Sequence, residues 1–229
     1  MTRVVVLAGG LPHAHDFAAT GAALVALYQA AGHTVDVVDH PDAVAAPLTA
    51  GADALVVSAL YWTMGGDAYD RWRAEWAYST PAATRRAITG FVAGGGGLVA
   101  NHTASICFDD WPEWGDIVGG SWHWGQSSHP PAGPVRAEVI AEHPVVAGLG
   151  VSFELVDEVY GGLDLRPDID VLATARRTPD DADQPVVWTH RYGAGRVVYD
   201  GFGHDVASIT DAGNARALTQ ALEWVTGGN

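Results

Sequence analysis

Ten histidines and a single cysteine are the most reactive side chains of this 229-residue sequence. Imidazole and carboxylate groups suit general acid–base chemistry near neutral pH, and imidazole also binds transition metals. Because Cys107 stands alone, a multi-cysteine metal site is excluded. Several histidines and carboxylates directly follow strand-like runs; they are His13, His15, Asp16, His102, Asp157, Glu158, His204 and Asp205.

The elements that must position these residues follow a regular order. Apolar, β-branched runs typical of buried strands alternate with helix-like stretches in the first half of the chain. This alternation favours an α/β fold with a mostly parallel sheet, in which ligands bind beyond the carboxyl ends of the strands. The predicted strands are 3–8, 34–40, 52–60, 97–102, 135–141, 170–176, 185–191 and 195–202, and the predicted helices include 16–31, 81–95 and 213–226.

The stretch AGGGGLVANHTA (93–104) has the strand–turn–helix layout of a nucleophile elbow, with His102 at the nucleophile's position. Histidine is seldom a stable covalent nucleophile, so this position favours acid–base work or metal ligation. Cys107 lies five residues further on, between Ile106 and Phe108, where a small thiol is expected to pack as an apolar group.

A divalent metal, with zinc the best match, is one hypothesis for the histidines. A catalytic zinc site needs about three protein ligands and an open position, and His15, His102 and His204 could supply them. Glu158 would then act as a carboxylate ligand or as general base, and Asp16 or Asp205 could fix a ring tautomer. No local H-x-x-x-H signature supports the metal. The same histidines could work as plain acids and bases.

Aromatic side chains gather in long segments after the strands. Tyr61 and Trp62 begin the insert 61–79, and Trp122 and Trp124 follow a Gly-Gly pair. Flat indole faces suit sugar rings, although they also fill cores and dimer contacts. The residues expected to bind substrate are His13, Asp16, Tyr61, Trp62, Trp122, Trp124, Tyr160 and Asp205.

The charge and length of the chain limit its partners. A formal net charge of −15 disfavours nucleic acid. No stretch approaches the roughly 20 apolar residues of a membrane span, and the apolar N-terminal run is too short for a signal peptide. We expect a single cytoplasmic domain over residues 1–229, with a small sugar-like ligand and a homodimer left open.

Several motifs, taken in order, resemble the ThuA-like (trehalose utilisation) family. They are GGLPHAHDF (9–17), GGGGLVANHTA (94–104), GGSWHW (119–124), EHPVVAGL (142–149), FELVDEVY (153–160), PVVWTHRYGAGRVVYDGFGHD (185–205) and LEWVTGG (222–228). The resemblance implies a flavodoxin-like three-layer sandwich with a mostly parallel sheet, similar to class I glutamine amidotransferases. It points to His15, Asp16, His102, Glu158, His204 and Asp205 as positions of interest.

Two departures qualify what the resemblance implies. In the amidotransferases the elbow residue is a cysteine, and here it is His102, so glutamine hydrolysis is not expected. The ThuA-like pattern also places an aromatic residue and then His-Pro after its Gly-Gly. This chain offers both His123 and His129 for that histidine.

Two functions remain open from the sequence. One is an enzyme, a hydrolase or an isomerase, that acts on a sugar or keto-sugar by histidine–carboxylate acid–base chemistry with His102, Glu158 and His204 as catalytic residues. The other is a non-catalytic sugar-binding or regulatory domain. Both predict that His15, His102, Glu158 and His204 meet at one edge of the sheet.

Overall fold

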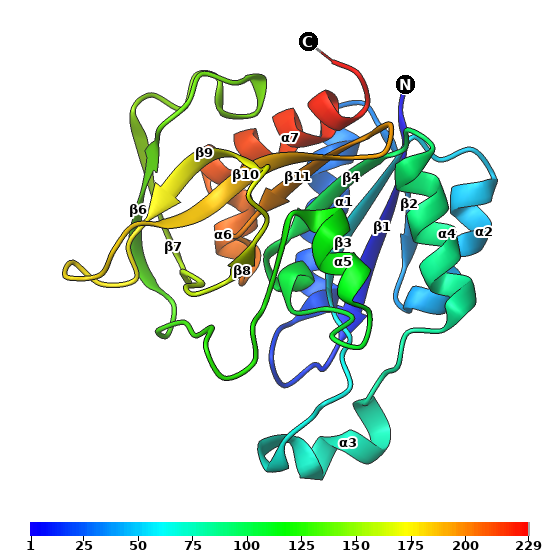
Figure 1. Ribbon diagram of the computed structural model, residues 1–229. Helices are drawn as coiled ribbons and strands as arrows, with labels where there is room; N and C mark the ends of the chain where they lie inside the picture. Colours follow the sequence, from blue (N-terminus) through cyan, green and yellow to red (C-terminus); the bar gives the residue numbers. More distant parts are fainter. Residues whose placement is uncertain (229) are drawn as a thin grey trace.

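A computed structural model describes residues 1–228 and contains a nine-stranded mixed sheet of order β2-β1-β3-β4-β11-β10-β9-β6-β7 (Figure 1). The strands from β2 to β11 pair in parallel, and those from β11 to β7 pair antiparallel. The strands of this sheet are β1 (Arg3–Gly10), β2 (Thr34–Val38), β3 (Ala54–Leu60), β4 (Gly97–Asn101), β6 (Gly133–Val139), β7 (Ser152–Asp157), β9 (Asp170–Ala175), β10 (Gln184–Tyr192) and β11 (Gly195–Asp200).

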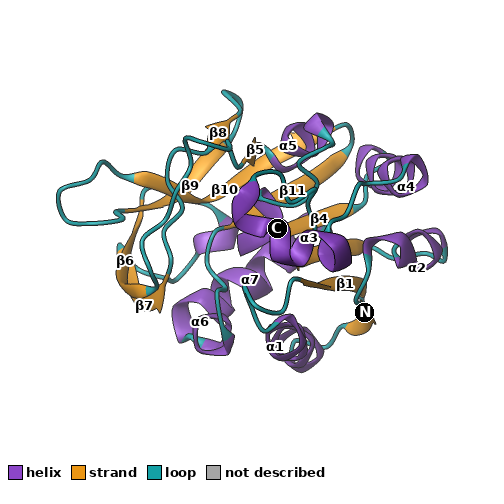
Figure 2. Cartoon of the chain, turned by 90° about the horizontal axis from the view of Figure 1, so that it is seen from below, coloured by secondary structure: helices purple, strands orange, loops and turns teal. Residues whose placement is uncertain are grey.

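Helices cover both faces of the sheet (Figure 2). One apolar core lies between the sheet and α1, α6 and α7, and a second lies between the sheet and α2, α4 and α5. The helices are α1 (Phe17–Ala30), α2 (Ala45–Thr49), α3 (Asp70–Trp76), α4 (Ala82–Ala93), α5 (Pro112–Val118), α6 (Val206–Thr210) and α7 (Ala212–Val225). Short 3-10 turns are η1 (Pro41–Ala43), η2 (Asp67–Tyr69), η3 (His102–Ser105) and η4 (Pro144–Val146), and β5 (Gly120–Ser121) pairs with β8 (Asp164–Leu165).

The sequence signals act as expected in the parallel half. Asp16 caps α1 by accepting from the backbone N–H of Ala19, and Gly32, with a φ of 88°, follows the helix. The predicted strand 34–40 ends early, at Val38, because His40 caps the 3-10 turn that begins at Pro41. The α/β class and the parallel arrangement of this half are therefore confirmed.

The antiparallel half was harder to predict. Strand β7 was not expected, and it lies at the edge of the sheet, where Glu154 and Val156 are exposed and Leu155 is buried. An edge strand covered on one face carries mixed residues instead of a continuous apolar run. The sheet as a whole is therefore mixed, with its parallel strands at one side.

The segment between β3 and α4 leaves the body of the molecule and carries η2 and α3 (Figure 1). Its aromatic residues Tyr69, Trp72 and Trp76 pack against the buried cluster of Leu11, Leu60 and Trp62. No helix among the described residues, 1–228, has the length and hydropathy needed to cross a bilayer.

Candidate functional site

A cavity of about 280 Å³ lies where β1, β3, β4, β7 and β11 end. Parallel strands present the residues that follow them at one edge of the sheet, so segments distant in sequence meet there. The lining combines imidazole and carboxylate groups with a large aromatic surface; it consists of Leu11, His13, Ala14, His15, Leu60, Trp62, Tyr69, Trp72, Ile106, Trp122, Trp124, His129, Glu158, Tyr160 and His204.

His102 lies directly behind this lining, at the sharp turn after β4. Its φ of 48° is one that residues other than glycine rarely adopt. The ring is buried, and Nδ1 lies 2.8 Å from the carbonyl oxygen of Gly201. A carbonyl can only accept, so Nδ1 carries the proton, and Nε2 accepts the Tyr160 hydroxyl over 3.1 Å. Burial lowers the pKa of His102, which makes the ring a neutral base.

The carboxylate of Glu158 lies among three imidazoles. Its oxygens are 3.2 Å from Nδ1 of His129, 3.5 Å from Nδ1 of His204 and 3.6 Å from Nε2 of His102. Burial alone raises the pKa of Glu158, but the interactions with His129 and His204 outweigh it and hold the pKa well below its usual range. The same interactions raise the pKa of His129 and of His204. Glu158 is therefore an anion that favours the protonated forms of His129 and His204.

His15 and His204 bring opposite ends of the chain together. Nδ1 of His15 donates to the carbonyl oxygen of His204 over 3.3 Å, which leaves Nε2 of His15 with a free lone pair. Burial, followed by the neighbouring His102, lowers the pKa of His15 to about 4. The cluster therefore contains neutral imidazoles, on His15 and His102, beside imidazoles that favour the cationic form.

Three of these histidines are also spaced as a metal site would require. One ring nitrogen from each of His15, His102 and His204 lies within 4.8 Å of the others. In His15 and His102 the remaining nitrogen donates to a backbone carbonyl. Histidines that bind metals usually make that second bond.

Aromatic rings form the wall and the rim of the cavity, as predicted for Trp62, Trp122 and Trp124. The ring of Trp122 lies 5.3 Å from that of Tyr160, with the two planes 79° apart. At the rim, His13 stacks on Trp72 with 5.7 Å between ring centroids. The cavity thus combines titratable groups with flat apolar surfaces.

Three residues expected to bind substrate are absent from the lining. Asp16 and Asp205 each cap a helix, accepting the backbone N–H of Ala19 and of Ser208. Tyr61 is buried, and its hydroxyl donates to the carbonyl oxygen of Asp39. Each of these polar groups serves the local fold, and Asp16 and Tyr61 line a neighbouring cavity together with His15. That the three residues bind the ligand stays a prediction.

Sequence reasoning left one site residue undecided and missed another. His129, which precedes Pro130, contacts Glu158, whereas His123 is exposed and lies outside the cavity lining. The His-Pro pair was the signal that could have decided between them. Asp157 was noted only as the neighbour of Glu158, yet it is 1% exposed and accepts several hydrogen bonds.

Cys107 lies in the core and not in the cavity. Its thiol donates to the carbonyl oxygen of Ala59 over 2.8 Å and accepts from the backbone N–H of Tyr61. Burial raises the pKa of the thiol to about 12. A thiol in this state is unreactive near neutral pH.

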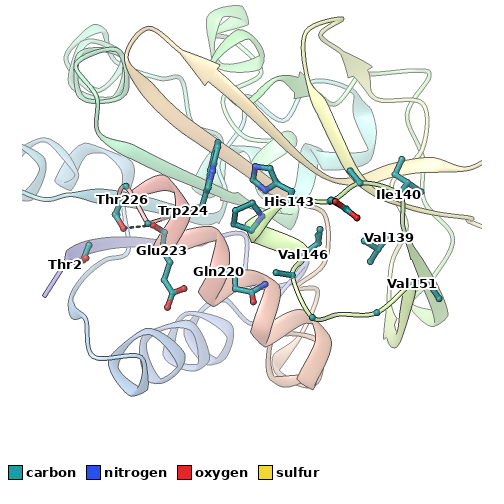
Figure 3. A pocket seen from close by; sticks show the side chains of 18 of the residues that line it. Thr2, Val139, Ile140, His143, Val146, Val151, Gln220, Glu223, Trp224 and Thr226 are labelled. Carbon is teal, nitrogen blue, oxygen red and sulfur yellow. Dashed lines mark hydrogen bonds between the residues drawn. The ribbon is translucent and has the colours of Figure 1, made fainter.

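A larger hollow of about 1370 Å³ lies elsewhere on the molecule, between α7 and the segment that carries η4 (Figure 3). Gln220 on α7 donates to the carbonyl oxygen of Val145, and His143 accepts from the backbone N–H of Val145. Two of its polar groups thus serve the local fold: Gln220 holds η4 against α7, and His143 caps η4. The cluster of His15, His102, His129, Glu158 and His204, the histidine–carboxylate cluster, lies outside this hollow.

Comparison with solved structures identifies similar folds. A ThuA-like protein from Parabacteroides merdae is 20% identical, with a TM-score of 0.79 over 99% of this chain and 90% of that one. A ThuA-like protein from Bacteroides uniformis is 19% identical, with a TM-score of 0.74 over 98% and 91% of the two chains. A β-galactosidase from Rahnella sp. R3 is 18% identical, with a TM-score of 0.63, and this chain, covered over 97% of its length, corresponds to 31% of it.

Comparison with curated proteins gives no match. The sequence model of one family, described as trehalose utilisation, matches residues 3–225, which is nearly the whole chain. The chain therefore belongs to the ThuA family.

Proposed function

We propose that this protein is an enzyme of carbohydrate metabolism that acts on a sugar or keto-sugar by histidine–carboxylate acid–base chemistry. One observation carries the proposal: the environments of neighbouring histidines push their pKa values in opposite directions. The pKa of His102 is lowered by burial, and that of His204 is raised by Glu158. A base and an acid held side by side are the arrangement that proton transfer requires.

The assignment of roles follows from the protonation states. Nε2 of His102 is the base once the Tyr160 hydroxyl releases it, and His204, whose protonated form Glu158 favours and whose ring centroid is 5.8 Å away, is the acid. On a keto-sugar, His102 takes a proton from the carbon beside the carbonyl while His204 gives a proton to the carbonyl oxygen. The product is an enediol. In the second half, the protonated His102 gives its proton to the former carbonyl carbon, and the now neutral His204 takes the proton of the hydroxyl on the neighbouring carbon. The carbonyl then lies on that neighbouring carbon, which is an isomerisation.

The shape and polarity of the cavity support a sugar as the ligand. A volume of about 280 Å³ is small and matches one monosaccharide unit better than a long chain. Trp122 and Tyr160 offer apolar faces for the C–H groups of a sugar ring, while the histidines and Glu158 face its hydroxyls. Membership of a family named for trehalose utilisation points to the same class of ligand.

We also propose that the cluster binds a divalent metal, zinc in the first place. His15, His102 and a neutral His204 would hold it in place of the acid–base roles. The carbonyl partners of His15 and His102 leave Nε2 of each ring as the ligand atom, and on His102 the metal would replace the hydrogen bond from Tyr160. Within the described residues, Oε2 of Glu158 and Nδ1 of His204 are buried without a hydrogen-bond partner, which also suits an added ligand. The metal would supply Lewis-acid polarisation of a carbonyl oxygen.

For the fold we propose the flavodoxin-like three-layer type. The order β2-β1-β3-β4-β11 corresponds to the flavodoxin-like order 2-1-3-4-5, and helices cover both faces of these strands. The elbow position is occupied by His102, and Cys107 lies in the core. We therefore do not expect Cys107 to act as the nucleophile of glutamine hydrolysis.

Deuterium exchange tests the function directly. A panel of ketoses and keto-sugars is incubated with the protein in D₂O, and NMR follows exchange at the carbon beside the carbonyl. Wild type should exchange one class of sugar, and Glu158→Gln should slow the exchange by about 100-fold, the typical contribution of a positioned acid–base group. His123→Ala, in the same loop as His129 but outside the cavity lining, is the matched control and should behave as wild type.

Each result has a clear meaning. Exchange that depends on Glu158 supports the enzyme. Sugar binding by calorimetry without exchange would replace the enzyme with a non-catalytic sugar-binding domain, and exchange that survives Glu158→Gln would contradict the assigned chemistry. For the metal, stoichiometric zinc in protein purified without a histidine tag, lost in His102→Ala, is the expected result. Substoichiometric metal together with activity that resists a chelator would contradict it.

A further inference from the structure

A buried carboxylate outside the cavity lining joins the segment that carries Glu158 to the loop that carries His204. Asp157, at the end of β7, is 1% exposed. Its Oδ1 accepts from the backbone N–H of Glu158 over 2.6 Å. Its Oδ2 accepts from the backbone N–H groups of Gly203, over 2.7 Å, and of His204, over 3.4 Å. The Ser208 hydroxyl donates to the same oxygen.

The loop that Asp157 holds, residues 201–204, is also the loop that orients two other histidines. The carbonyl oxygen of Gly201 accepts from Nδ1 of His102, and the carbonyl oxygen of His204 accepts from Nδ1 of His15. Two backbone carbonyls of this short loop therefore decide which ring nitrogen carries the proton in two separate histidines.

The loop has little freedom on its other side. Gly203 adopts a φ of 128°, and a Cβ at this position would lie 2.7 Å from Oδ1 of Asn101. Asn101 in turn donates to the carbonyl oxygen of Phe202 over 2.6 Å. The loop is thus held between Asn101 of β4 and Asp157 of β7, so losing one of these contacts is expected to move its carbonyls.

We propose that Asp157 is the positioning residue of the histidine cluster: it fixes loop 201–204, whose carbonyls impose the Nδ1–H tautomer on His15 and His102. The consequence for catalysis rests on the proposed function, whereas the claim about the tautomers rests only on these hydrogen bonds. A single buried carboxylate would then keep the proton off Nε2 of both rings, so that Nε2 of His15 and of His102, where it accepts the Tyr160 hydroxyl, offers the lone pair that a base or a metal ligand needs.

The contacts of Asp157 require a hydrogen-bond acceptor at both side-chain oxygens. Both carboxylate oxygens accept from N–H or O–H donors, and a carboxylate has acceptor sites on both. In Asp157→Asn one oxygen becomes an NH₂ group, which donates and cannot accept. Either the N–H of Glu158 or the N–H of Gly203 then loses its acceptor. The side chain keeps its size, which separates the loss of the hydrogen bond from the loss of packing.

The experiment compares Asp157→Asn with wild type by ¹⁵N NMR of the histidine rings, which distinguishes Nδ1–H from Nε2–H tautomers. In wild type, His15 and His102 should show the Nδ1–H form. In Asp157→Asn at least one of them should lose it, and deuterium exchange into the sugar should slow by about 10- to 100-fold through kcat, the usual cost of removing such a supporting group. Asp110→Asn is the matched control, because Asp110 accepts from the N–H and hydroxyl of Thr80, in another loop.

Unchanged tautomers in folded Asp157→Asn would overturn the proposal and leave Asp157 a structural residue. Altered tautomers in a protein whose wild type exchanges no sugar would support the positioning role and refute the proposed function alone. If Asp157→Asn does not fold, Ser208→Ala, which removes one donor and keeps the carboxylate, takes its place. Amide exchange at Gly203 and His204 should then be faster than in wild type, and unchanged exchange would overturn the proposal.

Discussion

Nε2 of His102 lies 3.6 Å from Oε2 of Glu158, although the two residues follow different strands. The imidazole is neutral because it is buried, and the carboxylate is an anion because imidazoles surround it. The proton acceptor, His102, is therefore in contact with Glu158, the anion that stabilises the protonated forms of His129 and His204. This relationship is the basis for the predictions about the site.

The backbone at His102 predicts an unusual order of stabilities. Because the φ of 48° is unfavourable for a residue with a Cβ, His102→Ala keeps the strain and His102→Gly relieves it. Chemical denaturation should show His102→Gly to be more stable than His102→Ala by about 1 kcal/mol. Both variants should lose sugar exchange. An alanine variant at least as stable as the glycine variant would mean that the turn is not strained.

The contact between His129 and Glu158 predicts a pH-dependent stability. Since the pKa of His129 is raised in the folded state, the contribution is fully present below the unfolded value of about 6.5 and is lost as the pH rises through the folded pKa. It should not exceed about 1 kcal/mol, because the His129 side chain is partly exposed. Urea unfolding between about pH 5.5 and pH 8.5 should show a smaller decline in His129→Asn than in wild type, while His123→Asn keeps the wild-type decline.

The burial of Asp200 predicts a second, larger dependence of the protein's stability on pH. Burial raises its pKa to about 8, so the folded protein keeps a proton that the unfolded chain releases near pH 4. Stability therefore falls as the pH rises from about 4 to about 8, by up to about 1.4 kcal/mol per pH unit. Asp200→Asn should flatten this slope in urea titrations. An equally steep slope in the variant would show that Asp200 is ionised in the folded protein.

Cys107 should be chemically silent in the folded state. Its buried thiol, with a pKa of about 12, should react with a thiol reagent only after denaturant is added. Cys107→Ala removes the hydrogen bond to Ala59 and should lower the free energy of unfolding by about 1 kcal/mol. The rate of deuterium exchange into the sugar should stay within twofold of the wild-type rate. A loss of activity in a well-folded variant would show that the thiol takes part in the reaction.

Trp122 should contribute to sugar affinity through its apolar face. Trp122→Ala removes one wall of the cavity and is expected to weaken binding by about tenfold, measured by calorimetry. Trp76→Ala is the control, because Trp76 is a partly buried tryptophan that lies outside this cavity lining. Equal effects of the two substitutions would remove the stacking role of Trp122.

Residues that directly follow core strands could be predicted from the sequence. His15, His102, Glu158 and His204 were expected at one edge of the sheet, and the structure brings them together there. For His15, His102 and His204 the reason is geometric: once a parallel strand is recognised, the position of the residues after it follows from the sheet. Glu158 follows the edge strand β7, which pairs antiparallel, and was expected at the site from the FELVDEVY motif instead. Their chemical roles are a separate question, which the exchange experiment addresses.

Residues placed by loops could not be predicted in the same way. His129 reaches Glu158 only through the path of the loop after β5, and no periodic pattern encodes that path. Asp16 and Asp205 were expected to face the ligand, but each precedes a helix whose N–H groups it caps. A carboxylate just before a helix is better predicted to accept a hydrogen bond from the first backbone N–H groups of that helix.

The position of β11 has a consequence for how the protein is made. This strand lies in the middle of the sheet, between β4 and β10, yet it is the last strand in the sequence. During synthesis β4, the last of the preceding parallel strands, and the antiparallel strand β10 both emerge before β11. Neither has its β11 partner until residues 195–200 have been synthesised. His204 follows even later, so Nδ1 of His15 can bond to its carbonyl partner only after residue 204 has been synthesised.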